Sequence, residues 1–187
     1  MGKQDKKTIG TGNRIVYSVN SSGESYDKDT IVTSWKVSYS EKISREKNEK
    51  GLRAPQFGAL SAIRAHWITS NSPTPATIVM PTGTGKTETI FTTVISERIR
   101  TTLIVVPSDL LRKQIFEGAS HFGILPDLGM VSSKGIFPNC ILYKSKVKED
   151  MEEQFLKELN NANIIVSTPT MIKNMPEKFF ESLIDNV

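Results

Sequence analysis

The sequence has few of the residues on which several kinds of site depend. It holds one cysteine, Cys140, and two histidines, His66 and His121, among 187 residues. A lone cysteine excludes an internal disulfide, and the set leaves no cysteine–histidine zinc constellation. We therefore expect a reducing, cytoplasmic compartment. We interpret Cys140 as a buried or half-buried bystander and the histidines as surface or satisfied core residues.

Long hydrophobic runs are also missing. No apolar stretch approaches the roughly 20 residues that a membrane-spanning helix needs. Residues 1–7 lead into a polar stretch without the apolar region of a secretory signal. The hydrophobic share of 37% and charged share of 24% are ordinary for globular proteins, which argues against a wholly disordered chain. We expect no membrane partner.

The charge is unevenly spread. Residues 1–53 carry 11 Lys and Arg against 7 Asp and Glu, whereas residues 54–187 carry 13 of each, so the net charge of +4 lies in the first segment. Such an excess indicates an anionic partner such as nucleic acid, and a solvated tail is the alternative. We divide the chain into a polar, basic N-terminal extension (1–50) and a domain (51–187).

Short apolar strands alternate with helical patterns beyond residue 51. Buried strands are predicted at 76–80, 103–106 and 163–167, with weaker ones at 128–131 and 141–143. Helices are predicted from residue 54, at 87–98, after Asp109, at 150–159 and at 171–183, the last with a new segment at Pro176. This alternation indicates an α/β fold, a parallel sheet with helices on both faces.

Other segments give weaker predictions. Residues 15–17 and 31–39 are candidate strands, and the charged residues 41–50 form either an exposed helix or a solvated spacer. The first helix of the domain, with Pro55 in its first turn, places Phe57 and Trp67 on an apolar face, where we expect core packing. Residues 71–75 break this helix.

The segment Met80–Thr87 reads Met-Pro-Thr-Gly-Thr-Gly-Lys-Thr, between a predicted strand and a predicted helix. Gly83 and Gly85 let successive N–H groups turn toward an anion, and the helix N-terminus adds partial positive charge. Lys86 can then reach the β and γ phosphates, and the Thr87 hydroxyl can bind Mg²⁺. The pattern predicts a nucleotide-phosphate loop; a glycine-rich turn that happens to carry a lysine is the alternative.

This segment resembles motif I of superfamily 2 helicases and translocases, most closely the DEAD/DEAH-box branch that includes restriction-enzyme motor subunits of the type III kind. The resemblance covers residues 51–187. It implies a first RecA-like motor domain, a P-loop NTPase with ATP and Mg²⁺ as cofactors. It also implies nucleic acid as partner, DNA in preference to RNA, and restriction-type modification or specificity subunits.

The resemblance assigns roles to individual residues. Lys86 and Thr87 are the implied catalytic residues, with Thr87 the implied metal ligand. Leu52–Gln56 resembles the Q motif, which implies adenine recognition by Gln56 with Arg53 beside it; an ordinary first-turn residue is the alternative. The remaining implied nucleotide contacts come from the loop and the start of its helix: Pro81, Thr82, Gly83, Thr84, Gly85 and Glu88.

Two further segments resemble the nucleic-acid motifs of the family. Val105–Leu111 with Gln114 resembles motif Ia, and Ser167–Pro169 resembles motif Ib. The implied contacts to the nucleic-acid backbone are Pro107, Ser108, Gln114, Thr168 and Pro169, and ordinary strand-to-helix turns are the alternative. Lys144, Lys146 and Lys148 alternate, which puts them on one side of an extended segment that faces either nucleic acid or solvent. Trp35 and Tyr39 either stack bases or pack the extension.

One feature departs from the family pattern. Motif II, the Walker B motif, places an Asp-Glu pair on the strand after the last helix, where the aspartate holds Mg²⁺ and the glutamate orients water. No Asp-Glu dipeptide occurs in the 187 residues. We therefore expect the front part of an ATP-dependent helicase or translocase, truncated before that strand, which binds ATP with negligible hydrolysis. A P-loop nucleotide switch and a non-catalytic nucleic-acid-binding module are the alternatives.

Overall fold

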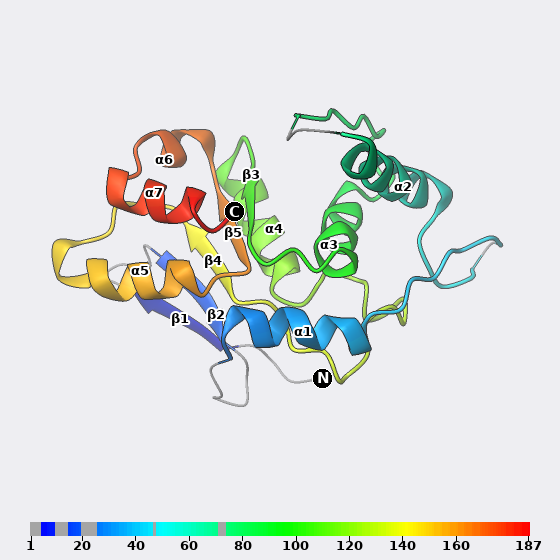
Figure 1. The fold of residues 1–187 in the computed structure, drawn as a ribbon, viewed down its shortest axis with the longest axis horizontal. Helices are drawn as coiled ribbons and strands as arrows, with labels where there is room; N and C mark the ends of the chain where they lie inside the picture. Colours follow the sequence, from blue (N-terminus) through cyan, green and yellow to red (C-terminus); the bar gives the residue numbers. More distant parts are fainter. Residues whose placement is uncertain (1–4, 10–14, 20–25, 47, 71–73) are drawn as a thin grey trace.

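The computed structural model describes the backbone of residues 5–9 and 15–19 and all atoms of residues 26–46, 48–70 and 74–187. These residues fold into an α/β arrangement around a five-stranded sheet of order β1-β2-β4-β5-β3 (Figure 1). Its strands are β1 (Asp5–Ile9), β2 (Ile15–Val19), β3 (Thr102–Val105), β4 (Cys140–Tyr143) and β5 (Ile164–Ser167).

The sheet is parallel where the apolar runs are strongest. β5 lies between β4 and β3 and is parallel to both, with Ile165 opposite Ile141 on one side and Leu103 on the other. β2 joins β4 in antiparallel register, and β1 joins β2 in the same way. The predicted parallel sheet is thus confirmed for three strands. An antiparallel pair extends it beyond β4, and β3 is its opposite edge.

Helices cover both faces, as the alternation predicts. They are α1 (Lys28–Ser38), α2 (Ala54–Thr69), α3 (Lys86–Ser96), α4 (Asp109–Ala119), α5 (Glu152–Asn160), α6 (Pro169–Lys173) and α7 (Glu177–Ile184). A short 3-10 turn, Glu149–Met151, leads into α5. Successive side chains of β4 separate the two faces. Leu142 packs into a cluster with α1, α3 and α4, whereas Tyr143 packs with α5 and α7.

Residues 31–39, a candidate strand in the sequence, form helix α1 instead. The Asp27 carboxylate caps the helix, and its buried residues recur at helical spacing. Trp35 is 1% exposed, its indole nitrogen donates to the Ile136 carbonyl at 2.9 Å, and its ring meets Phe122 edge to face. Trp35 therefore packs in the core. The division at residue 50 stays a prediction, and α1 shares one core cluster with α3 and α4.

The start of α1 is joined to the strands by amide side chains. Asn161 Nδ2 donates to the Tyr26 carbonyl at 3.1 Å, and Asn163 Nδ2 donates to the Lys28 carbonyl at 3.3 Å. The Lys28 ammonium in turn donates to Asn186 Oδ1 at 2.6 Å. These bonds connect the segment before α1, the region around β5 and the end of the chain.

The strand predicted at 76–80 is not formed, which corrects the strongest local expectation. Residues 74–80 are irregular, and Val79 is 87% exposed. The physical reason is the absence of a partner: no described strand pairs with this segment, so its backbone has no ladder to join. Residues 128–131 also form turns, with an isolated bridge from Val131 to Tyr39. The expected break at 71–75 lies partly outside the described residues.

Candidate nucleotide and nucleic-acid site

The backbone of the glycine-rich loop has the conformation that its sequence predicts. Gly83 and Gly85 have φ angles of 79° and 88°, in the left-handed region that favours glycine. Gly85 is the N-cap of α3, and no side chain caps this helix. The first N–H groups of α3 therefore lack intrahelical and side-chain capping partners, as an anion-binding loop requires.

The Pro81 carbonyl oxygen closes the loop. It accepts a hydrogen bond from Thr84 Oγ1 at 2.7 Å and another from the Lys86 ammonium at 2.9 Å. Lys86 is exposed, and an ammonium carries three N–H donors, so this bond leaves two for an anion. Thr82 is exposed, and Thr87 and Glu88 are half-buried at the start of α3.

Arg53 and Gln56, at the start of α2, contact this loop. Gln56 is 2% exposed; its Oε1 accepts from the Arg53 backbone N–H at 2.8 Å, and its Nε2 donates to the Gly85 carbonyl at 3.4 Å. Arg53 Nη2 donates to the Gly83 carbonyl at 3.3 Å. The structure thus unites the Q-like segment with the phosphate loop. The Gln56 amide keeps a further donor and a further acceptor for a ligand.

A cavity of about 450 Å³, lined by both polar and apolar side chains, adjoins Gln56. Glu49 orders one wall, because its carboxylate accepts from the backbone N–H groups of Arg45 at 2.6 Å and Glu46 at 3.2 Å. These two hydrogen bonds, that from Arg45 first, lower the pKa of Glu49. The cavity is lined by two loops and the start of α2: Ser44, Glu46, Asn48, Glu49, Gly51, Arg53, Gln56, Ile124 and Leu128.

Sequence reasoning missed this wall. Residues 41–50 were expected to form an exposed helix or a spacer, and their charge gave no sign of a cavity. Ile124 and Leu128 approach Gln56 from the turn region after α4, a contact that no local pattern indicates.

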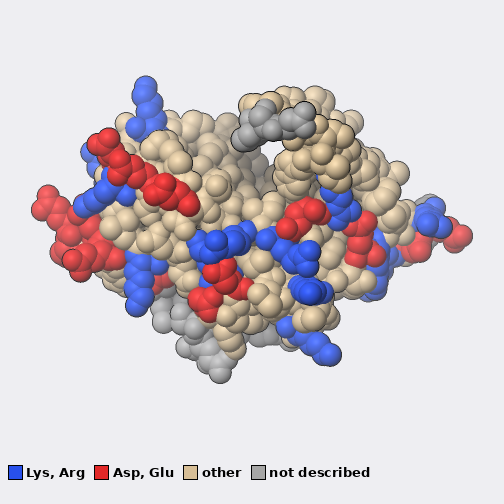
Figure 2. All heavy atoms as spheres, in the orientation of Figure 1, with Lys and Arg blue, Asp and Glu red and all other residues tan. Residues whose placement is uncertain are grey.

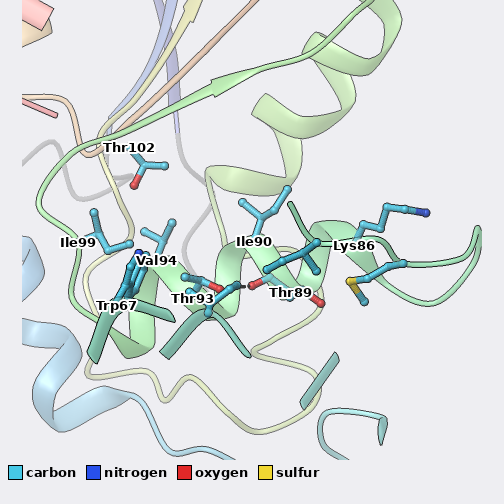
Figure 3. A pocket seen from close by; sticks show the side chains of 11 residues that line it. Trp67, Lys86, Thr89, Ile90, Thr93, Val94, Ile99 and Thr102 are labelled. Atoms are coloured by element: carbon cyan, nitrogen blue, oxygen red, sulfur yellow. Dashed lines mark hydrogen bonds between the residues drawn. The ribbon is translucent and has the colours of Figure 1, made fainter. Parts of the chain in front are cut away.

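An apolar groove of about 380 Å³ is lined by residues of α2, α3 and the segments beside them (Figure 3). Lys86 lies at one end with its ammonium directed away, and Trp67, Ile99 and Thr102 lie at the opposite end. Trp67 is 49% exposed, so its predicted place in the core is wrong, whereas Phe57 does pack against the core. The groove explains this exposure, because nothing among the described residues fills the space beside the indole.

The predicted nucleic-acid turns lie side by side. The Val106 N–H donates to the Ser167 carbonyl at 3.0 Å, which brings the turn after β3 against the turn after β5. Pro107 and Ser108 are exposed, and the Ser108 hydroxyl caps α4. On the second turn Thr168 is buried, and Pro169, the first residue of α6, is exposed. Gln114 is exposed farther along α4.

Charge near these turns is mixed. Lys144 is half-buried and Lys146 and Lys148 are exposed, and the acidic residues Glu149 and Asp150 follow at once. Figure 2 shows Lys and Arg interspersed with Asp and Glu over the visible face, with acidic side chains gathered toward the end that carries α5. This face therefore has no uniform basic field.

Two features are absent from the described part of the chain. No group of three or more His, Cys, Asp or Glu side chains is placed to hold a metal ion. No helix there is long and apolar enough to cross a bilayer. A magnesium ion bound together with nucleotide needs only one or two protein ligands, which the Thr87 hydroxyl at the start of α3 fits.

The sheet, the left-handed glycines and the uncapped start of α3 define an α/β protein with a loop of P-loop sequence. The sequence pattern of the type III restriction enzyme res subunit matches residues 49–186, and the chain belongs to that family. The matched residues are an N-terminal domain of a superfamily 2 helicase, part of a helicase or translocase ATPase motor. Neither a curated protein nor a solved structure matches the chain.

Proposed function

We propose that this chain binds ATP with Mg²⁺, and the backbone of DNA, as the front part of an ATP-dependent helicase or translocase. The contact of Gln56 and Arg53 with the carbonyls of Gly85 and Gly83 carries the nucleotide part. Arg53 and Gln56 also line the cavity of about 450 Å³, so the cavity and the phosphate loop share these two residues. A nucleotide can therefore place its base beside Gln56 and its phosphates at the start of α3.

Each residue has a distinct part in this binding. The spare donor and acceptor of Gln56 match the N7 acceptor and N6 amino donor of adenine. Lys86 neutralises the β and γ phosphates, and the Thr87 hydroxyl contributes to the magnesium shell. Bound Mg²⁺ supplies charge neutralisation at the phosphates. Pro81, Thr82, Gly83, Thr84, Gly85 and Glu88 form the remaining rim of the phosphate site.

Nucleic acid is proposed to cross the carboxyl edge of the parallel strands. Support comes from the adjacent turns at Pro107–Ser108 and Thr168–Pro169 and from the family, whose name refers to restriction of DNA. Gln114 extends this surface along α4. Because the chain holds no Asp-Glu pair, we expect nucleotide binding with negligible turnover by these 187 residues.

The nucleotide part is tested with a fluorescent ATP analogue and Mg²⁺. Lys86→Ala should weaken binding at least about tenfold, because a charge-assisted contact to phosphate is lost. Lys36→Ala, which removes an exposed lysine of α1, should bind as wild type. Equal affinity of the wild type and Lys86→Ala overturns the nucleotide site, and an ATP turnover rate that vanishes in Lys86→Ala overturns the expected lack of hydrolysis.

The nucleic-acid part is tested by titrating a labelled single-stranded DNA at several salt concentrations. Phosphate contacts make the logarithm of the binding constant fall linearly with the logarithm of salt concentration. A chain that binds the ATP analogue but shows no DNA binding even at low salt is a nucleotide switch, and this part of the proposal then fails.

A further inference from the structure

A buried arginine lies beneath the proposed nucleic-acid edge. Arg112, at the end of the first turn of α4, is 6% exposed. It faces inward with Ile115, Phe116 and Ala119, the other buried residues of the helix. Sequence reasoning passed over Arg112, although its spacing from these apolar residues indicates an inward direction. A guanidinium is seldom buried without a specific partner.

The partners of Arg112 lie on its own helix and at the end of β4. Its Nη2 lies 3.0 Å from Oδ1 of Asp109, the first residue of α4, and its Nη1 donates to the carbonyl of Tyr143, the last residue of β4, at 3.3 Å. The guanidinium fork therefore joins the start of α4, which follows β3, to the end of β4. Lysine has no planar fork with which to make both contacts in the same geometry.

The third strand end joins the same junction. The Ser167 hydroxyl, at the end of β5, donates to the Tyr143 carbonyl at 2.9 Å, so this oxygen accepts from both Ser167 and Arg112. The Ser167 carbonyl accepts from the Val106 N–H. The ends of β3, β4 and β5 are thus connected through one hydrogen-bonded network with a buried positive charge in it.

The two members of the Arg112–Asp109 pair are in different surroundings. The Arg112 side chain is 7% exposed, whereas that of Asp109 is 83% exposed. Water screens the carboxylate, so the pair is weak as an ion pair, and the positive charge beneath the turns is only partly compensated. A phosphate that approaches Pro107 or Thr168 would feel attraction from Arg112 and repulsion from Asp109.

We propose that Arg112 is a positioning residue for nucleic acid: it holds the three strand-end turns in register and supplies buried positive charge beneath them. Asp109 opposes that charge. The inference rests on the proposed nucleic-acid function, and it deepens that function because Arg112 is too buried to touch a phosphate itself. An arginine with only a structural role would affect nucleotide binding and DNA binding alike.

The test compares Arg112→Met, Arg112→Lys and Asp109→Asn with the wild type. Each protein is titrated with a labelled single-stranded DNA and, separately, with the fluorescent ATP analogue. Arg112→Met keeps the apolar stem and should weaken DNA binding about tenfold, since it removes charge-assisted hydrogen bonds. The DNA affinity of Arg112→Lys should lie between that of the wild type and that of Arg112→Met. Asp109→Asn should tighten DNA binding about threefold, because it removes an exposed opposing charge. Affinity for the ATP analogue should change less than about twofold in all three.

The inference requires that DNA affinity fall in Arg112→Met and rise in Asp109→Asn. Wild-type DNA affinity in Arg112→Met, equal weakening in Arg112→Met and Asp109→Asn, or a parallel loss of ATP-analogue binding overturns the inference. If Arg112→Met does not fold, Arg112→Lys and Asp109→Asn still give opposite signs or refute it. A wild type that binds the ATP analogue but no DNA refutes the proposed nucleic-acid function itself, which is a distinguishable result.

Discussion

The side-chain amide of Gln56 and the backbone of Gly85 are in direct contact. Gln56 Nε2 lies 3.4 Å from the Gly85 carbonyl oxygen, and a β-carbon built on Gly85 would lie 2.0 Å from the same nitrogen. Gly85 also has a φ of 88°. Two independent constraints, backbone conformation and close approach, therefore require glycine here.

Gly85→Ala should accordingly destabilise the protein and weaken ATP-analogue binding. The left-handed backbone alone costs a non-glycine residue about 1–2 kcal/mol, and displacement of Gln56 adds to this. Urea unfolding measures the change. Gly58→Ala is the control, because Gly58 lies within α2 and nothing approaches its would-be β-carbon within 4 Å. That variant should gain about 0.5–1 kcal/mol, and a similar gain in Gly85→Ala would contradict the constraint.

Gln56→Glu should weaken both folding and nucleotide recognition. A glutamate keeps an oxygen for the Arg53 N–H but loses the donor to the Gly85 carbonyl and adds negative charge near the phosphate loop. Because Gln56 is 2% exposed, we expect the free energy of unfolding to fall by about 1–3 kcal/mol and ATP-analogue affinity to fall about tenfold. Isothermal titration and urea unfolding measure the two quantities, and unchanged nucleotide affinity would exclude Gln56 from the site.

Lys28 should make stability rise with pH. Burial lowers the pKa of its ammonium below the usual 10.5, and the nearby Arg100 lowers it further, while Asp29 acts in the opposite direction. Between the lowered pKa and 10.5 the unfolded chain binds more protons than the folded one, so the free energy of unfolding increases with pH. Urea unfolding at several pH values measures this slope of the free energy of unfolding against pH. The part due to Lys28 is the part that wild type shows and Lys28→Met lacks. Lys36→Met, on the exposed side of α1, should retain it.

The edge of the sheet at β3 should promote self-association. β3 pairs with β5 alone among the described strands, and Val105 is 43% exposed. Unpaired edges of this kind invite strands from other molecules, and an added lysine discourages them. Light scattering at rising protein concentration should show less association for Val105→Lys. Val37→Lys places the same charge at a 72% exposed position on α1 and should leave association unchanged.

Local sequence patterns located the three parallel strands. β3 and β5 lie where strong strands were predicted, β4 lies at one of the weaker predictions, and Pro176 precedes α7 as expected. The run at 76–80 looks the same in sequence but has no partner strand. Strand formation depends on a distant neighbour, which composition does not encode.

In the candidate site, too, some features follow from local sequence and others depend on contacts between distant segments. The left-handed conformations of Gly83 and Gly85 follow from the local sequence, because a glycine-rich turn before a helix has a local conformational requirement. The phosphate-binding role of Lys86 stays a prediction. The cavity wall around Glu49 and the bridge from Arg112 to Tyr143 depend on contacts between segments far apart in the chain. Residues 31–39 were misjudged because β-branched and aromatic side chains favour a strand, although their buried positions recur every three to four residues.

The packing of α1 also determines where the chain can be cut. The family pattern begins at residue 49, which invites an expression fragment starting there. Such a fragment would remove Trp35 and Ile31, fully buried side chains of the same core as α3 and α4, and would remove the edge-to-face contact between Trp35 and Phe122. Loss of one large core side chain costs about 3–5 kcal/mol, comparable with the whole stability of many domains. The shortest soluble fragment should therefore begin before Tyr26, well upstream of the recognisable family sequence.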